Sequence, residues 1–487
     1  MNRERSALSD EPASADPSRS VRRAGRRFRQ LFSATGAVLV LLVAGLAVAN
    51  VNQGPRLAAA ELDLDASVAR GNPRLLLTSN QPLAEVAAGQ VTVSPATEVS
   101  TSVADRALTV QFAGILRYNT VYTVTVTDVA STTQGATSTL EYEFTTPDID
   151  VYALQRDRRL DDTGAKRPDT VRRTTLQGQG DGDIVFSGPR IQQYAALEDH
   201  LAAVTLDDDD AATLEVVSFA GGENVQVPVP SAGVIENLVA ARSKHLIAYT
   251  FTSAPTAGGR RYDRTPFVYD LTAESGLPAE VTGVDGLPMI VNDLRFVPNS
   301  TSLVVHDAGK TLFLIDMRGN AVLTLLGEHD EMRGFVPGTR SLVVVDLGDS
   351  STIDIADGFV TTVDLAPSLL DTSADPGTLV LLSEQGRYAR LFLQQADDSN
   401  QPASRIAVTD AGDSRVAFTP ASTSSRVRDF CVSPNGQYLA VETISVGGVG
   451  DGYLTLPAFS GMTTTFVDLD RGTSSRSVSG FLPDWCG

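Results

Sequence analysis

A unit of strand, turn and strand recurs at a fixed spacing in the C-terminal part of this chain. Each copy joins a proline-containing turn to a run of apolar residues, and Pro298, Pro337 and Pro376 are each 39 residues apart. A period near 40 residues is typical of the four-stranded blade of a β-propeller, because each such unit buries its apolar faces against its neighbours. The repeat therefore predicts a β-propeller over residues 148–487.

The same pattern returns outside this regular stretch. A clear copy runs from Phe430 through Pro434 to Val441, and degenerate copies lie at Glu198-Asp199-His200-Leu201 and Ser243-Lys244-His245-Leu246. Together these copies resemble the TolB-type β-propeller family.

The ends of this region suggest how the propeller closes. Phe481-Leu482-Pro483-Asp484-Trp485 has the pattern of an innermost strand, but no outer strands follow it. An open blade would expose strand edges, so we expect residues 151–154, 170–176 and 183–186 to supply the outer strands of that blade. This interpretation favours seven blades, the last of them shared, and six blades remain an alternative.

Residues 62–147 have a different pattern, with short runs of period two. Leu108, Val110 and Phe112 alternate with polar residues, as do Leu140, Tyr142 and Phe144, which is typical of half-buried strands in a β-sandwich. Together with Leu75-Leu76-Leu77, Asn80-Gln81-Pro82-Leu83, Val91-Thr92-Val93-Ser94-Pro95, Leu116-Arg117-Tyr118-Asn119-Thr120 and Phe144-Thr145-Thr146-Pro147, this region resembles the bacterial Ig-like domain of the SbsA type. The resemblance implies a spacer or stalk, and the predicted fold class of the whole chain is all-β.

The N-terminus has the pattern of a membrane anchor. Residues 1–30 carry eight arginines against four acidic residues and are predicted to form a disordered cytoplasmic tail, whereas residues 31–51 carry no charge and are long enough to cross a bilayer as a helix. The arginines before this segment predict a cytoplasmic N-terminus and an extracytoplasmic bulk. Retention of the segment is favoured over the alternative, secretion after cleavage near Ala47-Val48-Ala49 or Ala58-Ala59-Ala60.

Charge and cysteine content describe the exported part. The chain has a formal net charge of −20, and the part after residue 30 is more acidic still, with 31 basic against 55 acidic residues. Such a surface repels nucleic acid and anionic lipid. The two cysteines, Cys431 and Cys486, both lie in the exported part, where an oxidising environment permits a disulfide; two buried thiols are the alternative.

Catalytic and metal-binding motifs are weak in this sequence. It lacks GxSxG, HExxH, P-loop and GxGxxG motifs, so it does not support an enzyme. The four histidines are scattered, and His200 and His245 occupy matching turn positions, which favours a role in turn architecture over metal binding; the others are His306 and His329. No cofactor is predicted; the clustered carboxylates of Asp207–Asp210, Asp181-Gly182-Asp183 and Asp468-Leu469-Asp470 are weak calcium candidates, and solvated turns are the favoured interpretation.

The best candidates for ligand contacts are polar residues on the innermost strands, because these strands line the central channel of a propeller. They are Asn237, Asp293, Arg333, Asp371, Arg428 and Asp429. This set of mixed charge could orient a polar ligand, but the favoured interpretation is that it holds water and ion pairs between blades.

Two functions are consistent with an anchor, an Ig-like domain and a propeller in one chain. One is a membrane-anchored binding or scaffold protein whose Ig-like stalk presents the propeller to an envelope protein or a cell-wall glycan. The alternative is an exported hydrolase or lyase acting on a polar substrate at the channel.

Overall fold

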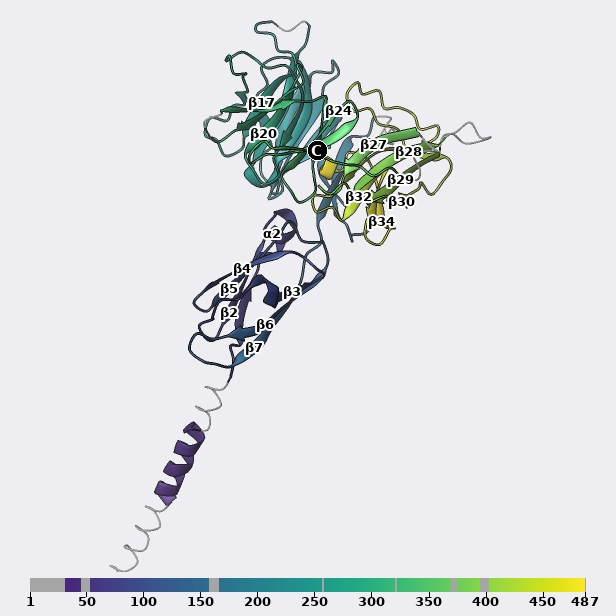
Figure 1. The fold of residues 1–487 in the computed structure, drawn as a ribbon. Coiled ribbons are helices and arrows are strands. Elements are labelled where there is room, and N and C mark those ends of the chain that lie inside the picture. The colour runs from purple at the N-terminus through teal and green to yellow at the C-terminus, as the bar shows by residue number, and fades with distance from the viewer. Residues whose placement is uncertain are drawn as a thin grey trace, which may run out of the picture.

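The structure is a computed structural model that describes residues 31–44, 53–156, 166–255, 258–319, 322–368, 375–394 and 403–486. It is all-β apart from short helices: an elongated sandwich leads into a large assembly of sheets, as Figure 1 shows. The predicted tail, residues 1–30, and the candidate residue Asp371 lie outside the described residues.

The N-terminal apolar segment is helical over residues 31–44, and every side chain of this stretch is exposed. None of the helices in the described ranges combines the length and the apolar character needed to cross a membrane. The predicted transmembrane helix over 31–51 is therefore not confirmed, because residues 45–51 lie outside the described part of the chain.

The first folded unit is a β-sandwich of two antiparallel sheets. One has the order β1-β2-β5-β4 and the other the order β3-β6-β7. The strands are β1 (Leu57–Glu61), β2 (Arg74–Ser79), β3 (Val91–Ser94), β4 (Val99–Ala104), β5 (Ala107–Phe112), β6 (Val121–Ala130) and β7 (Thr137–Thr145), with helix α2 (Leu64–Ala69) and the 3-10 helix η1 (Ala88–Gln90) between them.

Alternate residues of these strands form the sandwich core. Leu108, Val110 and Phe112 of β5 are fully buried, and the Phe112 ring lies 6.4 Å from that of Tyr122 and 6.1 Å from that of Phe144. Side chains of a strand point to opposite faces in turn, so a period of two places one apolar set inside. The structure thus places this apolar set as the alternation predicts.

Seven further sheets follow along the chain, the first with three strands and the other six with four in sequence order. Their strands are, sheet by sheet, β8 (Asp150–Gln155), β9 (Asp169–Thr175), β10 (Asp183–Gly188); β11 (Ile191–Ala196), β12 (His200–Leu206), β13 (Ala212–Ser218), β14 (Val225–Val227); β15 (Gly233–Ala241), β16 (Leu246–Ser253), β17 (Thr265–Asp270), β18 (Ala279–Glu280); β19 (Val291–Phe296), β20 (Ser302–Asp307), β21 (Thr311–Asp316), β22 (Leu323–Glu328); β23 (Glu331–Phe335), β24 (Ser341–Asp346), β25 (Asp349–Asp354), β26 (Val360–Thr362); β27 (Asp375–Leu381), β28 (Tyr388–Gln394), β29 (Ala403–Asp410), β30 (Asp413–Phe418); and β31 (Ser425–Val432), β32 (Tyr438–Ser445), β33 (Thr463–Asp468), β34 (Thr473–Ser479). Two 3-10 helices, η2 (Arg242–Lys244) and η3 (Asp484–Cys486), lie beside them.

Apolar clusters join each of these sheets to the next, and the last to the first. Six clusters connect consecutive sheets, and a seventh packs Tyr438 and Phe466 of the last sheet against Val151 and Ala153 of the first. The seven sheets therefore form a closed ring, which is the architecture of a β-propeller. In the four-stranded sheets the second strand is packed on both faces, and most of these strands contain a continuous apolar run such as Leu303-Val304-Val305, all fully buried.

The C-terminal segment closes this ring. Leu154 and Phe481 exchange two backbone hydrogen bonds of 2.8 and 3.0 Å, so Phe481 pairs with the exposed edge of β8. Gly480 has a φ of +118°, and a Cβ there would lie 2.7 Å from the carbonyl oxygen of Leu154, so this close approach requires glycine. Asp484 adds side-chain contacts: it accepts 2.9 Å from the Tyr152 N–H and 2.6 Å from Arg242.

The sandwich is docked onto one face of the propeller through Tyr118. Its ring is 1% exposed and stacks on Tyr438 and Trp485, with ring centroids 6.4 and 6.3 Å away. The Tyr118 N–H donates to the side chain of Gln437 over 2.8 Å, and the Arg70–Glu198 and Arg117–Asp470 ion pairs, each of 2.8 Å, flank the contact. A buried aromatic contact of this kind holds the two units as one body.

The two cysteines lie on neighbouring elements: Cys431 is on β31 and Cys486 ends η3, which packs against β31. The structure records no free cysteine in its described part. The Cys431–Cys486 disulfide stays a prediction.

We expect Tyr118→Ala to weaken the docking of the sandwich on the propeller. Removing a fully buried aromatic side chain typically costs about 3–5 kcal/mol, and here the loss falls on the junction. Calorimetry of the full chain in detergent should show one unfolding transition separating into two. Tyr118→Phe keeps the stacked ring and should melt like the wild type; an unchanged single transition for Tyr118→Ala would contradict this role.

We expect Phe481→Ala to destabilise the whole ring, since Phe481 is 1% exposed and supplies the closing contact. The free energy of unfolding, measured by urea denaturation, should fall by about 3–5 kcal/mol. Phe359→Ala is the matched control, because Phe359 is 67% exposed at the outer edge of a sheet. Equal effects of the two substitutions would show that closure does not depend on Phe481.

Candidate functional site

The innermost strands of the six four-stranded sheets share one irregularity. Each has a register shift against its second strand, at or beside Gln192, Asn237, Asn292, Arg333, Gly377 and Arg428. A β-bulge inserts one extra residue into a strand and changes the direction of its side chain. Each innermost strand of these sheets therefore has one residue that departs from the regular alternation. Three of the predicted contact residues, Asn237, Arg333 and Arg428, occupy bulges, and Asp293 and Asp429 directly follow one.

Hydrogen bonds between neighbouring sheets hold part of this ring of bulges. Gln192 and Gln193 both donate to the carbonyl of Ile235, over 2.7 and 3.0 Å. Asn237, whose φ is +50°, donates to the carbonyl of Asn292 over 3.1 Å. Asn237 is therefore engaged within the wall of the channel.

A cavity of about 810 Å³ lies at the end of the channel where the innermost strands finish. The strands β19, β23, β27 and β31 supply its wall, and Gly71, Asn72 and Ile115 of the sandwich line it from outside the propeller. Its charged lining is of both signs: Arg295, Arg333 and Arg340 against Asp354, Glu384 and Asp429. Such a lining suits a polar ligand that carries charges of both signs.

Arg333 and Asp429 are the two predicted residues that line this cavity. Arg333 forms an ion pair with Glu331, and the Phe430 N–H donates to Asp429 over 2.8 Å. Burial raises the pKa of Asp429, because it disfavours the charged carboxylate. The hydrogen bond from Phe430 and the charges of Arg428 and Arg333 oppose part of this shift.

Asp293 has the same local geometry as Asp429 but does not line the cavity. Its carboxylate accepts from the Leu294 N–H over 2.9 Å and lies 3.6 Å from Arg295. Burial raises the pKa of Asp293, and Arg295 and the backbone hydrogen bond offset only part of that shift.

Arg428 is not among the residues that line the cavity. It donates to Glu442 over 2.6 Å and to the carbonyl of Pro457 over 3.0 Å. The second contact belongs to the connection between β32 and β33, residues 446–462, which we call the strap. Both partners are within the protein, so Arg428 serves to hold the strap in place.

The strap contacts two innermost strands, through Thr455 to Glu236 of β15 and through Pro457 to Arg428 of β31. Its main anchor is Arg156, which pairs with Asp451 over 2.6 Å with both side chains at most 4% exposed. The Arg156 guanidinium also lies 3.6 Å from the centre of the Tyr453 ring, and Thr455 donates to Glu236 of the third sheet over 3.2 Å. Removing one partner of a buried ion pair leaves an uncompensated charge, so this anchor fixes the strap firmly.

Sequence reasoning missed several residues of the cavity. Arg295 follows Asp293 by two positions on β19, and the period of two could have identified it. Gly71, Asn72 and Ile115 belong to the sandwich, and no local pattern connects them to a channel in another unit.

The weak calcium candidates are bonded within their own turns or to nearby backbone. Asp207 accepts from the N–H groups of Asp209 and Ala211, and Asp468 accepts from those of Asp470 and Arg471. Asp181 accepts from the Ser479 N–H over 2.9 Å. Asp207, Asp468 and Asp181 thus accept hydrogen bonds from backbone N–H groups, and calcium binding stays untested.

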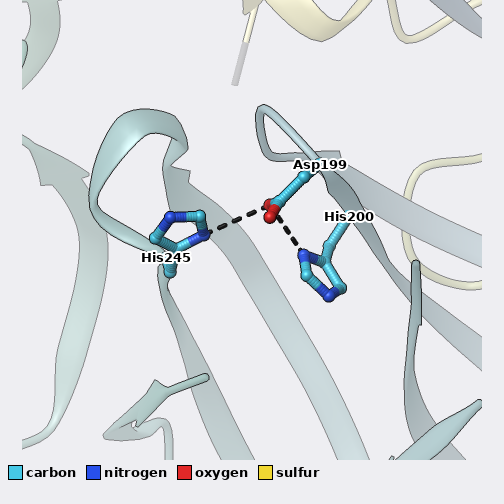
Figure 2. A group of neighbouring side chains, drawn as sticks. All are labelled: Asp199, His200 and His245. Carbon is cyan, nitrogen blue, oxygen red and sulfur yellow. Dashed lines mark hydrogen bonds and ion pairs between the residues drawn. The ribbon is translucent and has the colours of Figure 1, made fainter. Parts of the chain in front are cut away.

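The histidines fall into two groups. His306 is buried and its Nε2–H donates to the carbonyl of His329 over 2.9 Å, while His329 Nδ1 lies 2.7 Å from Asp346. His200 and His245, in contrast, meet at one carboxylate, that of Asp199, as Figure 2 shows. Among the described residues, this is the group whose three side chains could hold a metal ion.

Comparisons with known proteins concern the fold alone. No protein-family model and no curated protein matches the chain. The β-propeller domain of Cps50 (Swd1) from Myceliophteria thermophila is similar at 13% identity and a TM-score of 0.36, over 60% of this chain and 86% of that one. The tricorn protease is similar at 12% identity and a TM-score of 0.25, over 66% of this chain but only 35% of that one.

The raised pKa of Asp293 predicts a pH-dependent stability. A carboxyl whose pKa is higher in the folded than in the unfolded state contributes stability below the unfolded value, and this contribution is lost as pH rises through the folded value. Asp293→Asn should therefore be more stable than the wild type at pH 7, with the difference vanishing below about pH 4. Thermal melts of the full chain across this range would measure it, with the exposed Asp208→Asn as control. A variant that is less stable at pH 7 would mean that the Arg295 ion pair outweighs burial.

Proposed function

We propose that this chain is an extracytoplasmic binding or scaffold protein of the bacterial envelope. In this proposal residues 31–51 anchor it in the membrane, and the sandwich acts as a stalk that presents the propeller to an envelope protein or a cell-wall glycan. The observation that carries the proposal is the cavity of about 810 Å³ on the propeller axis, with its lining of both charges.

The docking of the sandwich supports the stalk. A flexible tether would need few contacts, but Tyr118 is buried in the propeller and two ion pairs flank it. A rigid stalk holds a binding surface in a fixed orientation, which lowers the entropy lost on binding. The apolar, exposed stretch 31–44 is consistent with an anchor at the far end of the sandwich.

The cavity supports recognition of a polar partner. Arg333 on β23 and Asp429 on β31 both line it, and Phe335, Phe430 and Trp485 contribute aromatic surface. Opposite charges beside aromatic rings suit a protein segment or a sugar carrying charged groups, because each group finds a complementary contact.

A second function, that of a hydrolase or lyase, draws on the raised pKa values of Asp293 and Asp429. Carboxyl groups with raised pKa values serve as general acids. Each of the two, however, accepts from the N–H of the residue that follows it, over 2.9 and 2.8 Å. The repetition of one local geometry in two sheets favours a structural role, so the binding function is preferred.

The proposal predicts that substitutions in the cavity weaken partner binding. The full chain, immobilised in detergent micelles, would be incubated separately with purified cell-wall glycan and with solubilised envelope proteins. We expect retention of a partner from one of these, and an affinity about tenfold or more weaker for Arg333→Ala and Asp429→Ala, since a charged contact is typically worth about 1.5–3 kcal/mol.

Arg471→Ala is the matched control for Arg333→Ala. It removes one positive charge too, but from the outer part of the last sheet, where the Arg471 side chain is 80% exposed. Equal binding by all variants would move the site away from the cavity. Failure of the wild type to retain either kind of partner would contradict the proposal and favour a test of turnover.

A further inference from the structure

The turns that follow the innermost strands of the second and third sheets meet at one carboxylate. Asp199 and His200 lie where β11 leads into β12, and His245 lies where β15 leads into β16. His200 Nδ1 is 2.7 Å and His245 Nδ1 is 3.2 Å from the same oxygen of Asp199 (Figure 2). The three ligating atoms all lie within 4.8 Å of one another.

The separations are close to those of a metal site. A tetrahedral ion with bonds of about 2.0–2.1 Å to imidazole nitrogen and carboxylate oxygen places its ligand atoms about 3.3 Å apart. The His245 contact of 3.2 Å agrees with that value, and the His200 contact of 2.7 Å is about 0.6 Å shorter, so a side-chain rotation would have to open it. The imidazole rings stand at 90° with centroids 6.4 Å apart, and so they do not stack on each other.

The backbone holds all three residues in place. The carbonyl of Asp199 accepts from the Phe219 N–H over 2.9 Å, that of His200 from the Leu197 N–H over 2.8 Å, and that of His245 from the Leu271 N–H over 3.0 Å. Every one of these bonds ties a turn to a neighbouring segment of its own sheet. The backbone that carries the three side chains is therefore held in place, as a binding site requires.

We propose that Asp199, His200 and His245 form a binding site for one divalent transition-metal ion of the zinc type. Two imidazole nitrogens with one carboxylate oxygen select this class over calcium or magnesium, which prefer sites made of oxygen alone. Three protein ligands leave one position for water. The side chains of Asp199, His200 and His245 are 53%, 28% and 33% exposed, so an ion can reach them from solvent.

A metal at this position would link two sheets beside the docked sandwich. Glu198, the residue before Asp199, forms the 2.8 Å ion pair with Arg70 of the sandwich. The ion would therefore connect the second and third sheets of the ring at the face that carries the stalk. This inference is independent of the proposed function, since it concerns a different part of the propeller.

Zinc titration of the full chain tests the proposal. Protein made without a histidine tag, stripped with a chelator and kept in detergent at pH 7.5, would be titrated with ZnCl₂ in a calorimeter. We expect one binding event per chain, with an affinity about tenfold or more weaker in His200→Ala and in His245→Ala. The affinity should also fall in acid, because protons compete with the metal ion for imidazole nitrogen.

His329→Gln is the matched control. His329 has a carboxylate partner at 2.7 Å, as His200 does, but belongs to no group of three ligands in the described part of the chain. It should bind zinc like the wild type, and thermal melts should show all variants folded. Absence of the event in the wild type, its persistence in both alanine variants, or its equal loss in His329→Gln would overturn the proposal.

Discussion

Each propeller sheet is stable only because it is packed between two others. The second strand of each four-stranded sheet is largely buried on both faces, and the shared clusters run around the whole ring without a break. A single open seam would expose two apolar faces and an unpaired strand edge. The whole ring therefore depends on the seam between the first and last sheets, where Phe481 pairs with Leu154.

The same closure also positions the stalk. Asp484 and Trp485 follow Phe481 directly; Asp484 binds Arg242 of the third sheet, and Trp485 stacks on Tyr118 of the sandwich. One short C-terminal segment thus joins the ring, the sandwich and the edge of the central cavity. Closure, docking and the shape of the candidate site are consequently coupled, and a defect in one should be felt in the others.

The candidate site was predictable in part. Arg333 and Asp429 were identified from their position on innermost strands, and both line the cavity. Asn237, Asp293 and Arg428 also lie at or beside bulges, but Asn237 and Arg428 bond to other groups of the channel wall and the strap, and Asp293 lies outside the cavity. The sequence shows that a residue is polar and lies on an innermost strand. Which group it forms hydrogen bonds with depends on the packing of neighbouring sheets and loops.

The sequence by itself determined the kind of unit that folds. Continuous apolar runs at a period of 39 residues specify sheets buried on both faces, and alternating residues specify the sandwich, because burial acts directly on local pattern. Only the tertiary structure decided which distant residues meet. His200 and His245 seemed in sequence to be matching turn residues, yet the packing of two sheets brings both to Asp199. The contact of Tyr118 with Trp485 has the same origin, since contacts between units far apart in sequence depend on the closure of the ring and leave no local signal.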